Sequence, residues 1–151
     1  MTTIAYRHGV LAADRAVTAN GSRLYDVGKL SRRADGALIA VSGSAGEAGA
    51  MKRWLLDGAK GQAPAHRDKC STEAVVVLPS GEIYEWDSGV MIGPIVPAAG
   101  RDFFAWGSGS MAALGAMLMG ASAKKAVEVA SQIDVYTSAG VDCLSLSIAA
   151  G

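Results

Sequence analysis

The sequence predicts an α+β fold in which antiparallel sheets are flanked by helices. Apolar residues alternate with period two near the start and in the middle of the chain, and they recur at helical spacing in two other regions. The resulting order is strands, one helix, strands, two helices and a final strand, which is typical of α+β domains. A length of 151 residues is ordinary for one domain, so we expect a single domain over residues 1–151.

Two hairpins and a helix are expected in the first part of the chain. Alternating segments over 3–6 and 10–13 surround a turn at Gly9, and segments over 29–32 and 37–41 surround the turn pair Asp35-Gly36. After Gly43, apolar residues at 48, 51, 55 and 59 indicate a helix that stops near Gly58 or Gly61. Residues 61–71 then form a polar connection.

The second part of the chain is also expected to contain strands followed by helices. Strands are predicted over 74–78, 82–86 and 102–106, with a Gly/Pro-rich loop before the third. Two helices follow over 110–119 and 123–132, and Ser122 has the residue type and place of a helix N-cap. A strand over 144–148 closes the pattern.

Composition excludes several classes of protein. Lys and Arg number 14 against 14 Asp and Glu, without a basic cluster, so we expect no nucleic-acid partner. The longest apolar runs are far shorter than the roughly 18–20 residues that span a bilayer, so no membrane partner is expected. Charged residues interrupt the first segment, and Cys70 and Cys143 lack disulfide or metal spacing, which favours the cytoplasm. His8 and His66 also lack ligand spacing, and no metal site is predicted.

The start of the chain carries the first chemical signal. A small residue after Met1 favours removal of the initiator methionine, which would leave Thr2 with a hydroxyl and a free α-amine. An α-amine titrates at about 7.7–8, so it can accept the hydroxyl proton at neutral pH. Thr2 is therefore a candidate nucleophile that holds its own general base.

The residues that follow resemble a known family. The run Thr2-Thr3-Ile4 through Ala12-Ala13-Asp14, then Lys29-Leu30 and Ser42-Gly43-Ser44, is similar to the proteasome β-subunit family, and most of all to its bacterial HslV-type peptidase subunit. Segments 81–84, 106–110 and 134–137 resemble later motifs of the same family in the same order. The resemblance implies a four-layer α-β-β-α sandwich, the fold of N-terminal-nucleophile hydrolases.

The resemblance also assigns roles to residues. Thr2 would be the nucleophile, Lys29 would supply positive potential beside it, and Asp14 would compensate and orient that charge. The alternatives are a solvated turn acid at position 14 and a surface lysine at position 29. Gly43 lies between a predicted strand and a predicted helix, so its N–H can point at the oxyanion of acyl transfer.

Three later residues complete the predicted site. Ser108 resembles the family serine that bonds near the threonine amine, although a helix N-cap is an equal alternative. Asp134 and Thr137 match the family's Asp-x-x-Ser pattern, with Thr in place of Ser. The resemblance implies that the loop from Asp134 to Thr137 can present carbonyls to a structural monovalent or divalent cation, and it implies no other cofactor.

The predicted function is that of a threonine endopeptidase inside a homo-oligomeric ring, active once Met1 is removed. The resemblance implies polypeptide substrates and an AAA+ ATPase unfoldase as partner. Shortening between residues 58 and 74, relative to the family, falls where ring packing or the ATPase surface would be affected. Two alternatives stay open: a catalytically silent assembly or structural protein of the same fold with Met1 retained, and an N-terminal-nucleophile amidohydrolase acting on small amides.

Overall fold

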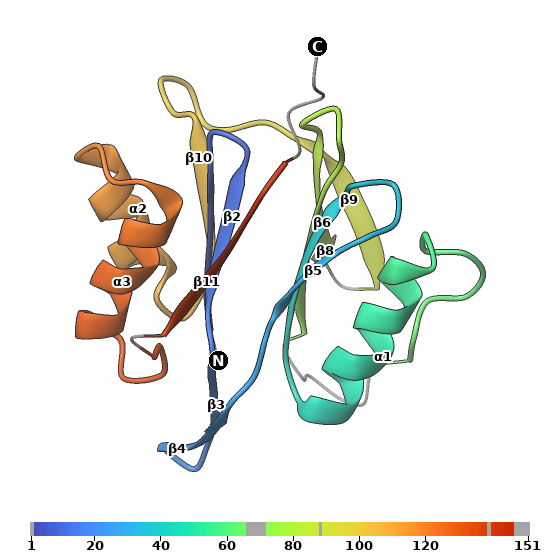
Figure 1. The fold of residues 1–151 in the computed structure, drawn as a ribbon, viewed down its shortest axis with the longest axis horizontal. Helices are drawn as coiled ribbons and strands as arrows, with labels where there is room; N and C mark the ends of the chain where they lie inside the picture. Colours follow the sequence, from blue (N-terminus) through green and yellow to red (C-terminus); the bar gives the residue numbers. More distant parts are fainter. Residues whose placement is uncertain (1, 66–71, 88, 139, 147–151) are drawn as a thin grey trace. The chain divides into compact units, whose positions relative to one another are not determined.

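The computed structural model describes residues 2–65, 72–87, 89–138 and 140–146. The chain divides into two compact units, the first built from residues 1–30 and 97–144 and the second from 31–96 and 145–151. Figure 1 shows the helices and strands of both units. The α+β class with antiparallel sheets is confirmed.

The first unit is built on a four-stranded sheet with the order β10-β1-β2-β11. These strands are β1 (Thr3–Arg7), β2 (Val10–Asp14), β10 (Phe103–Gly107) and β11 (Val141–Ser145). The predicted hairpin at Gly9 joins β1 to β2, with His8 and Gly9 both at positive φ, and Ile4 pairs with Ala13. On its other side β1 pairs antiparallel with β10, which places Thr3 opposite Gly107.

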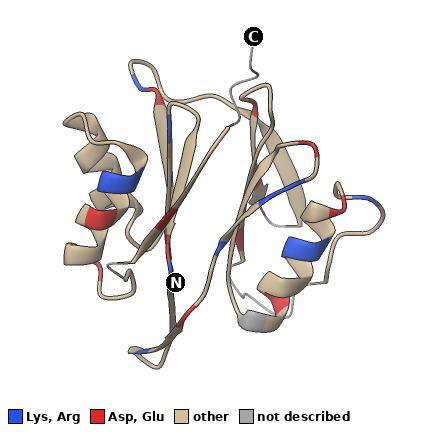
Figure 2. Ribbon diagram, in the orientation of Figure 1, with Lys and Arg blue, Asp and Glu red and all other residues tan. Residues whose placement is uncertain are grey.

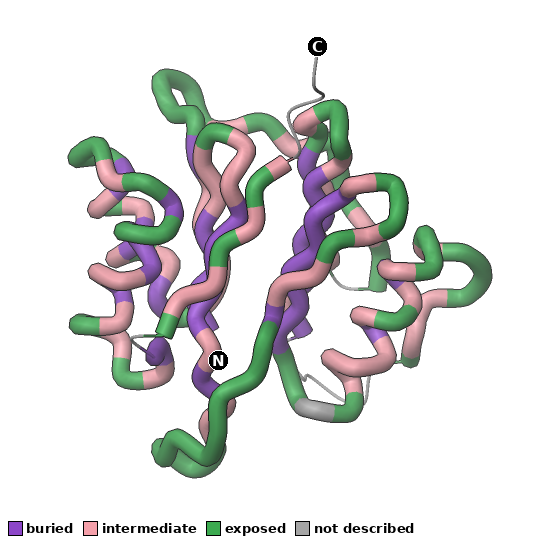
Figure 3. The backbone as a smooth tube through the Cα atoms, in the orientation of Figure 1, coloured by how far each residue is buried: buried purple, intermediate pink, exposed green. Residues whose placement is uncertain are grey.

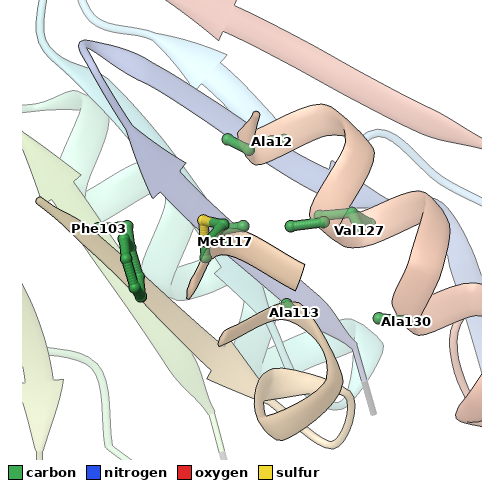
Figure 4. Close-up of a cluster of buried hydrophobic side chains, with 9 residues drawn as sticks. Ala12, Phe103, Ala113, Met117, Val127 and Ala130 are labelled. Carbon is green, nitrogen blue, oxygen red and sulfur yellow. The ribbon is translucent and has the colours of Figure 1, made fainter. Parts of the chain in front are cut away.

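Two helices cover this sheet. They are α2 (Ser110–Leu118) and α3 (Ala123–Ile133), and the Ser122 side chain caps α3 by accepting the Lys125 N–H at 3.1 Å, as predicted. Both helices and the sheet contribute to one buried apolar cluster, which includes Met117 and Val127 (Figure 4). Many of its members are alanines, so the helices can approach the sheet closely.

A two-stranded ribbon leaves the first sheet. It consists of β3 (Ala16–Ala19) and β4 (Ser22–Asp26), joined by Asn20 and Gly21, which both have positive φ. Every residue of β4 is exposed. Its sequence does not alternate apolar and polar residues, so apolar periodicity could not predict this strand. The Asn-Gly pair was the one available signal for this hairpin.

The second unit has a five-stranded sheet with the order β5-β6-β7-β8-β9. Its strands are β5 (Leu30–Arg32), β6 (Leu38–Ser42), β7 (Glu73–Val77), β8 (Ile83–Asp87) and β9 (Val90–Ile95). The helix α1 (Ala45–Leu56) packs on β6 through Met51 and Leu55. Figure 3 shows β6 and β7 as the most deeply buried part of this unit.

One strand was not predicted, the last strand is shifted, and α1 ends close to its predicted stop near Gly58. Strand β9 replaces part of the predicted Gly/Pro-rich loop; Pro94 is tolerated because β9 is an edge strand, and Gly93 fits because Tyr84 leaves no room for a Cβ. The last strand begins at Val141, three residues earlier than predicted, and residues 147–148 lie outside the described residues. Helix α1 ends at Leu56, so Ala59 lies beyond it. The polar connection over 61–71 is described only as far as residue 65.

Charged residues are dispersed over the described helices, strands and turns, without a basic patch (Figure 2). Among the described residues, no group of three or more His, Cys, Asp or Glu side chains is placed to hold a metal ion. No helix in the described ranges is long and apolar enough to cross a membrane.

We predict that Met117→Ala destabilises the first unit by about 2–5 kcal/mol, because it removes a side chain that is 1% exposed at the centre of the cluster. Met119→Ala is the matched control, since Met119 is 89% exposed, and its effect should stay within about 0.5 kcal/mol. Urea unfolding of the two variants makes the comparison. Equal losses would show that this cluster does not carry the stability of the unit.

Candidate active site

The first hairpin brings Thr2 and Asp14 together. Thr2 directly precedes β1 and Asp14 ends β2, so antiparallel pairing puts both at the same end of the hairpin. Both are buried, with Asp14 fully inaccessible and Thr2 only 2% exposed. The Thr2 hydroxyl donates a hydrogen bond to Asp14 Oδ1.

The Asp14 carboxylate is the most heavily bonded group of the site. Its Oδ1 also accepts the Thr3 N–H at 3.0 Å and Lys29 Nζ at 2.9 Å. A buried carboxylate is costly unless its oxygens are satisfied by donors and its charge is compensated. Lys29 supplies the compensating charge in an ion pair that is nearly inaccessible to solvent.

The second oxygen of Asp14 anchors backbone instead of side chains. Asp14 Oδ2 accepts the Ala16 N–H at 3.0 Å and the Ser138 N–H at 3.2 Å. Ala16 begins the ribbon that leads to Lys29, and Ser138 follows the predicted 134–137 segment. The carboxylate that bonds Thr2 therefore also fixes the backbone at residues 16 and 138.

The Lys29 ammonium lies directly beside the Thr2 hydroxyl. Its Nζ donates to Thr2 Oγ1 at 2.6 Å, and its side chain is 4% exposed. Burial lowers the pKa of Lys29 from the ordinary 10.5, although Asp14 and the charge of Asp26 partly oppose the shift. A cation held at this distance stabilises negative charge that develops on the threonine oxygen.

A second polar cluster forms around Asp134. Its Oδ2 accepts the Ser108 hydroxyl at 2.5 Å and the Thr137 hydroxyl at 2.6 Å, and its Oδ1 accepts the Tyr136 N–H at 3.4 Å. Burial by itself would raise the pKa of Asp134, but these hydrogen bonds hold the pKa below its usual value. Asp134 is therefore an anion that orients two hydroxyl groups.

Ser108 connects this cluster to the nucleophile. Its Oγ lies 3.3 Å from the Thr2 carbonyl oxygen. A serine has one hydroxyl proton, and the shorter contact assigns that proton to Asp134. The lone pairs of Ser108 Oγ then remain available to a donor near the Thr2 backbone.

Two glycines provide the room for these contacts. A Cβ at Gly107, which has φ +96°, would lie 1.9 Å from the Thr2 carbonyl oxygen. At Gly109 a Cβ would lie 2.1 Å from Thr3 Oγ1 and 3.1 Å from Thr137 Oγ1. The Gly-Ser-Gly sequence therefore places Ser108 while leaving space for the segment that contains Thr2 and Thr3.

Six of the seven predicted site residues lie in the first unit, in the clusters around Asp14 and Asp134. They are Thr2, Asp14, Lys29, Ser108, Asp134 and Thr137. The alternatives of a solvated acid at Asp14 and a surface lysine at Lys29 are wrong, since both are buried. Ser108 is not a helix N-cap, because Gly109 occupies that position. Gly43 belongs to the second unit and lies between β6 and α1. A Cβ at this position would lie 3.0 Å from Thr72 Oγ1. The oxyanion role of Gly43 stays a prediction.

Thr3 and Ser138 are two residues of the site without a role predicted from the sequence. Thr3 is fully buried and Ser138 is 4% exposed, and each contacts Asp14 through its backbone N–H. Backbone donors leave no trace in residue type, so Ser138 carried no sequence signal. The Thr-Thr pair was visible, but only its first member had an evident chemical use.

Comparison with protein-family models and with curated protein sequences gives no match. Solved structures do match over nearly the whole chain. HslV from Trypanosoma brucei is 21% identical, with 97% of this chain and 99% of that chain covered and a TM-score of 0.70. BPH from Thiobacillus denitrificans in complex with epoxomicin is 21% identical with the same coverage and a TM-score of 0.62. A second structure of BPH from Thiobacillus denitrificans is 20% identical, with 97% of this chain and 98% of that chain covered and a TM-score of 0.60. At this identity the likeness establishes the fold, which is that of HslV and BPH.

We predict that Asp14→Asn destabilises the protein by about 3–5 kcal/mol, because it leaves the buried Lys29 ammonium uncompensated and replaces an acceptor by a donor. Asp102→Asn is the control: Asp102 is 48% exposed and pairs with Arg7 and His8 at the surface, so its loss should cost far less than that of Asp14. Urea unfolding at neutral pH measures both. Similar costs would contradict a special status for Asp14.

Lys29 should titrate below the ordinary lysine pKa of 10.5, in the direction set by burial. NMR of the protein with ¹³C-labelled lysine measures this, and Asp26→Asn should lower the Lys29 pKa further because it removes an opposing charge. Between the lowered pKa and 10.5 the unfolded chain binds more protons, so the Lys29 contribution to the free energy of unfolding rises with pH there. A Lys29 pKa at or above 10.5 would contradict the buried placement.

Proposed function

We propose that this chain is a threonine-type N-terminal-nucleophile peptidase that becomes active when Met1 is removed. The observation that carries the proposal is the buried Thr2 hydroxyl, held between Lys29 Nζ at 2.6 Å and the Asp14 carboxylate. A threonine in a core contact needs neither a buried cation nor a buried anion. The fold of HslV and of the epoxomicin complex of BPH supports the same reading.

Activation of the hydroxyl would use the residue's own amine. With Met1 gone, the α-amine of Thr2, with a pKa of about 7.7–8, can take the hydroxyl proton at neutral pH. Lys29 favours the developing alkoxide, and Asp14 keeps Lys29 charged and in place. Ser108, whose oxygen lies beside the Thr2 backbone, is placed to accept a hydrogen bond from that amine.

The reaction then follows acyl transfer. Thr2 Oγ1 attacks the scissile carbonyl carbon, and the amine holds the proton that leaves the hydroxyl. The C–N bond breaks, the leaving amine takes that proton, and an ester joins the substrate's acyl part to Thr2. A water molecule, deprotonated by the α-amine of Thr2, then hydrolyses the ester. The α-amine returns that proton to Thr2 Oγ1, which restores the hydroxyl. The Gly43 N–H is the proposed donor to the oxyanion formed in both steps.

The proposal includes assembly into a homo-oligomeric ring in the cytoplasm, with an AAA+ ATPase that unfolds polypeptide substrates. A ring would restrict an otherwise open protease to chains that can enter it. Exposed apolar side chains on α2 and at its C-cap support association: Met111 is 78%, Leu118 58% and the C-cap residue Met119 89% exposed. The two lone cysteines support a reducing compartment.

Intact mass before and after treatment with an epoxyketone tests the nucleophile. This reagent requires both the hydroxyl and the free amine of an N-terminal threonine. The purified protein should lack Met1 and gain one adduct per chain, and Thr2→Ala should gain none. Lys29→Ala should slow adduct formation by about 100-fold or more, whereas Lys124→Ala, at an exposed lysine paired with Glu128, should not.

Other results would select the alternatives. Retained Met1 without an adduct would make the chain a catalytically silent assembly or structural protein. An adduct with turnover of small amides, but no cleavage of peptides or unfolded proteins, would make it an amidohydrolase.

A further inference from the structure

Thr3 contacts both polar clusters of the site. Its backbone N–H donates to Asp14 Oδ1 at 3.0 Å, and its hydroxyl lies 2.7 Å from the Thr137 hydroxyl. The residue is fully buried, and its backbone is fixed by pairing with Gly107 across β1 and β10. A buried hydroxyl needs a hydrogen-bond partner, and for Thr3 that partner is Thr137, 134 residues away in the sequence and bonded to Asp134.

The direction of the hydrogen bonds follows from counting protons. Thr137 has one hydroxyl proton, and its 2.6 Å contact with Asp134 Oδ2 uses it, because an ionised carboxylate only accepts. Thr3 must then donate to Thr137. The result is a directed chain from Thr3 through Thr137 to Asp134, whose Oδ2 also holds Ser108.

Packing leaves Thr3 little freedom to abandon this contact. The space in front of its Oγ1 is the space that a Cβ at residue 109 would occupy, 2.1 Å away. A Cβ at residue 109 would also lie 3.1 Å from Thr137 Oγ1 and 3.1 Å from the Ala130 methyl carbon. Gly109 has an ordinary φ of −92°, so space, and not backbone conformation, is what requires glycine there.

We propose that the Thr3 hydroxyl is a positioning group for the nucleophile, acting through Thr137 and Asp134 to hold Ser108 beside the Thr2 backbone. This inference rests on the proposed function. Thr3 does not touch the reacting oxygen, and its contribution is to fix the acceptor that the Thr2 amine needs. A hydroxyl that acts in this way should affect the rate of the chemical step and leave substrate affinity unchanged.

The experiment compares variants that separate shape from hydrogen bonding. Thr3→Val keeps the shape and removes the hydroxyl, and it should lower both kcat for peptide cleavage and the rate of epoxyketone adduct formation by about 10-fold, as expected for one buried hydrogen bond. KM should not change. Thr3→Ser restores the donor and should recover most of the lost rate. Ser131→Ala removes a part-buried hydroxyl that bonds a helix carbonyl, and it controls for hydroxyl loss as such.

A double-mutant cycle tests the route. Thr3→Val combined with Thr137→Val should be little slower than Thr137→Val alone, because the Thr3 hydroxyl acts through Thr137. If Thr3→Val is not folded, as judged by near-UV circular dichroism, Thr3→Cys offers the same comparison, since a thiol is a weak donor.

The outcomes separate this inference from the proposed function. A wild-type chain that forms no adduct overturns both. A reactive wild type overturns the inference alone if Thr3→Val reacts at the same rate, if only KM changes, or if the losses at Thr3 and Thr137 multiply independently.

Discussion

The buried carboxylate of Asp14 is the interaction on which the rest of the first unit depends. Its two oxygens accept hydrogen bonds from Thr2, Thr3 and Lys29 on one side and from the backbone of residues 16 and 138 on the other. These donors come from the start of β1, the ribbon, the segment before β5 and the loop after α3. Because an unsatisfied buried anion is costly, each segment is constrained by the need to deliver its donor. The geometry of the nucleophile is a consequence of that constraint.

The two carboxylates of the site are used differently. Asp14 is fully inaccessible and is compensated by an ammonium, so it holds a charged pair next to the Thr2 oxygen. Asp134 is half-buried and is satisfied by hydroxyl and backbone donors, so it orients neutral groups. The first therefore contacts the Thr2 oxygen, and the second contacts Ser108, the group beside the Thr2 backbone. Thr3 touches both clusters, through its N–H and its hydroxyl.

Close packing of small residues makes this arrangement possible. The core between α2, α3 and the sheet is dominated by alanine, with Met117, Val127 and Phe103 filling the larger gaps. Glycine at 107 and 109 allows the strand–helix connection to lie against the start of β1 without a side chain between them. Many different sequences can place apolar residues at the right period and small residues at the contacts. This is consistent with the same fold in proteins that are only 20–21% identical to this chain.

The amino-acid sequence was enough to predict the α+β class, the hairpins β1–β2 and β5–β6, the three helices and the Ser122 cap, because periodicity, turn residues and caps are local signals. It also pointed to Thr2, Asp14 and Lys29 as residues of one site, although through a family resemblance and not through spacing. The exposed ribbon and β9 were not predicted, because neither has the alternating apolar face that indicates a strand. Tertiary structure alone decided the contacts of Thr3, Ser138 and Gly109. Those depend on backbone donors and on the space between segments more than 100 residues apart, and neither is encoded in residue type.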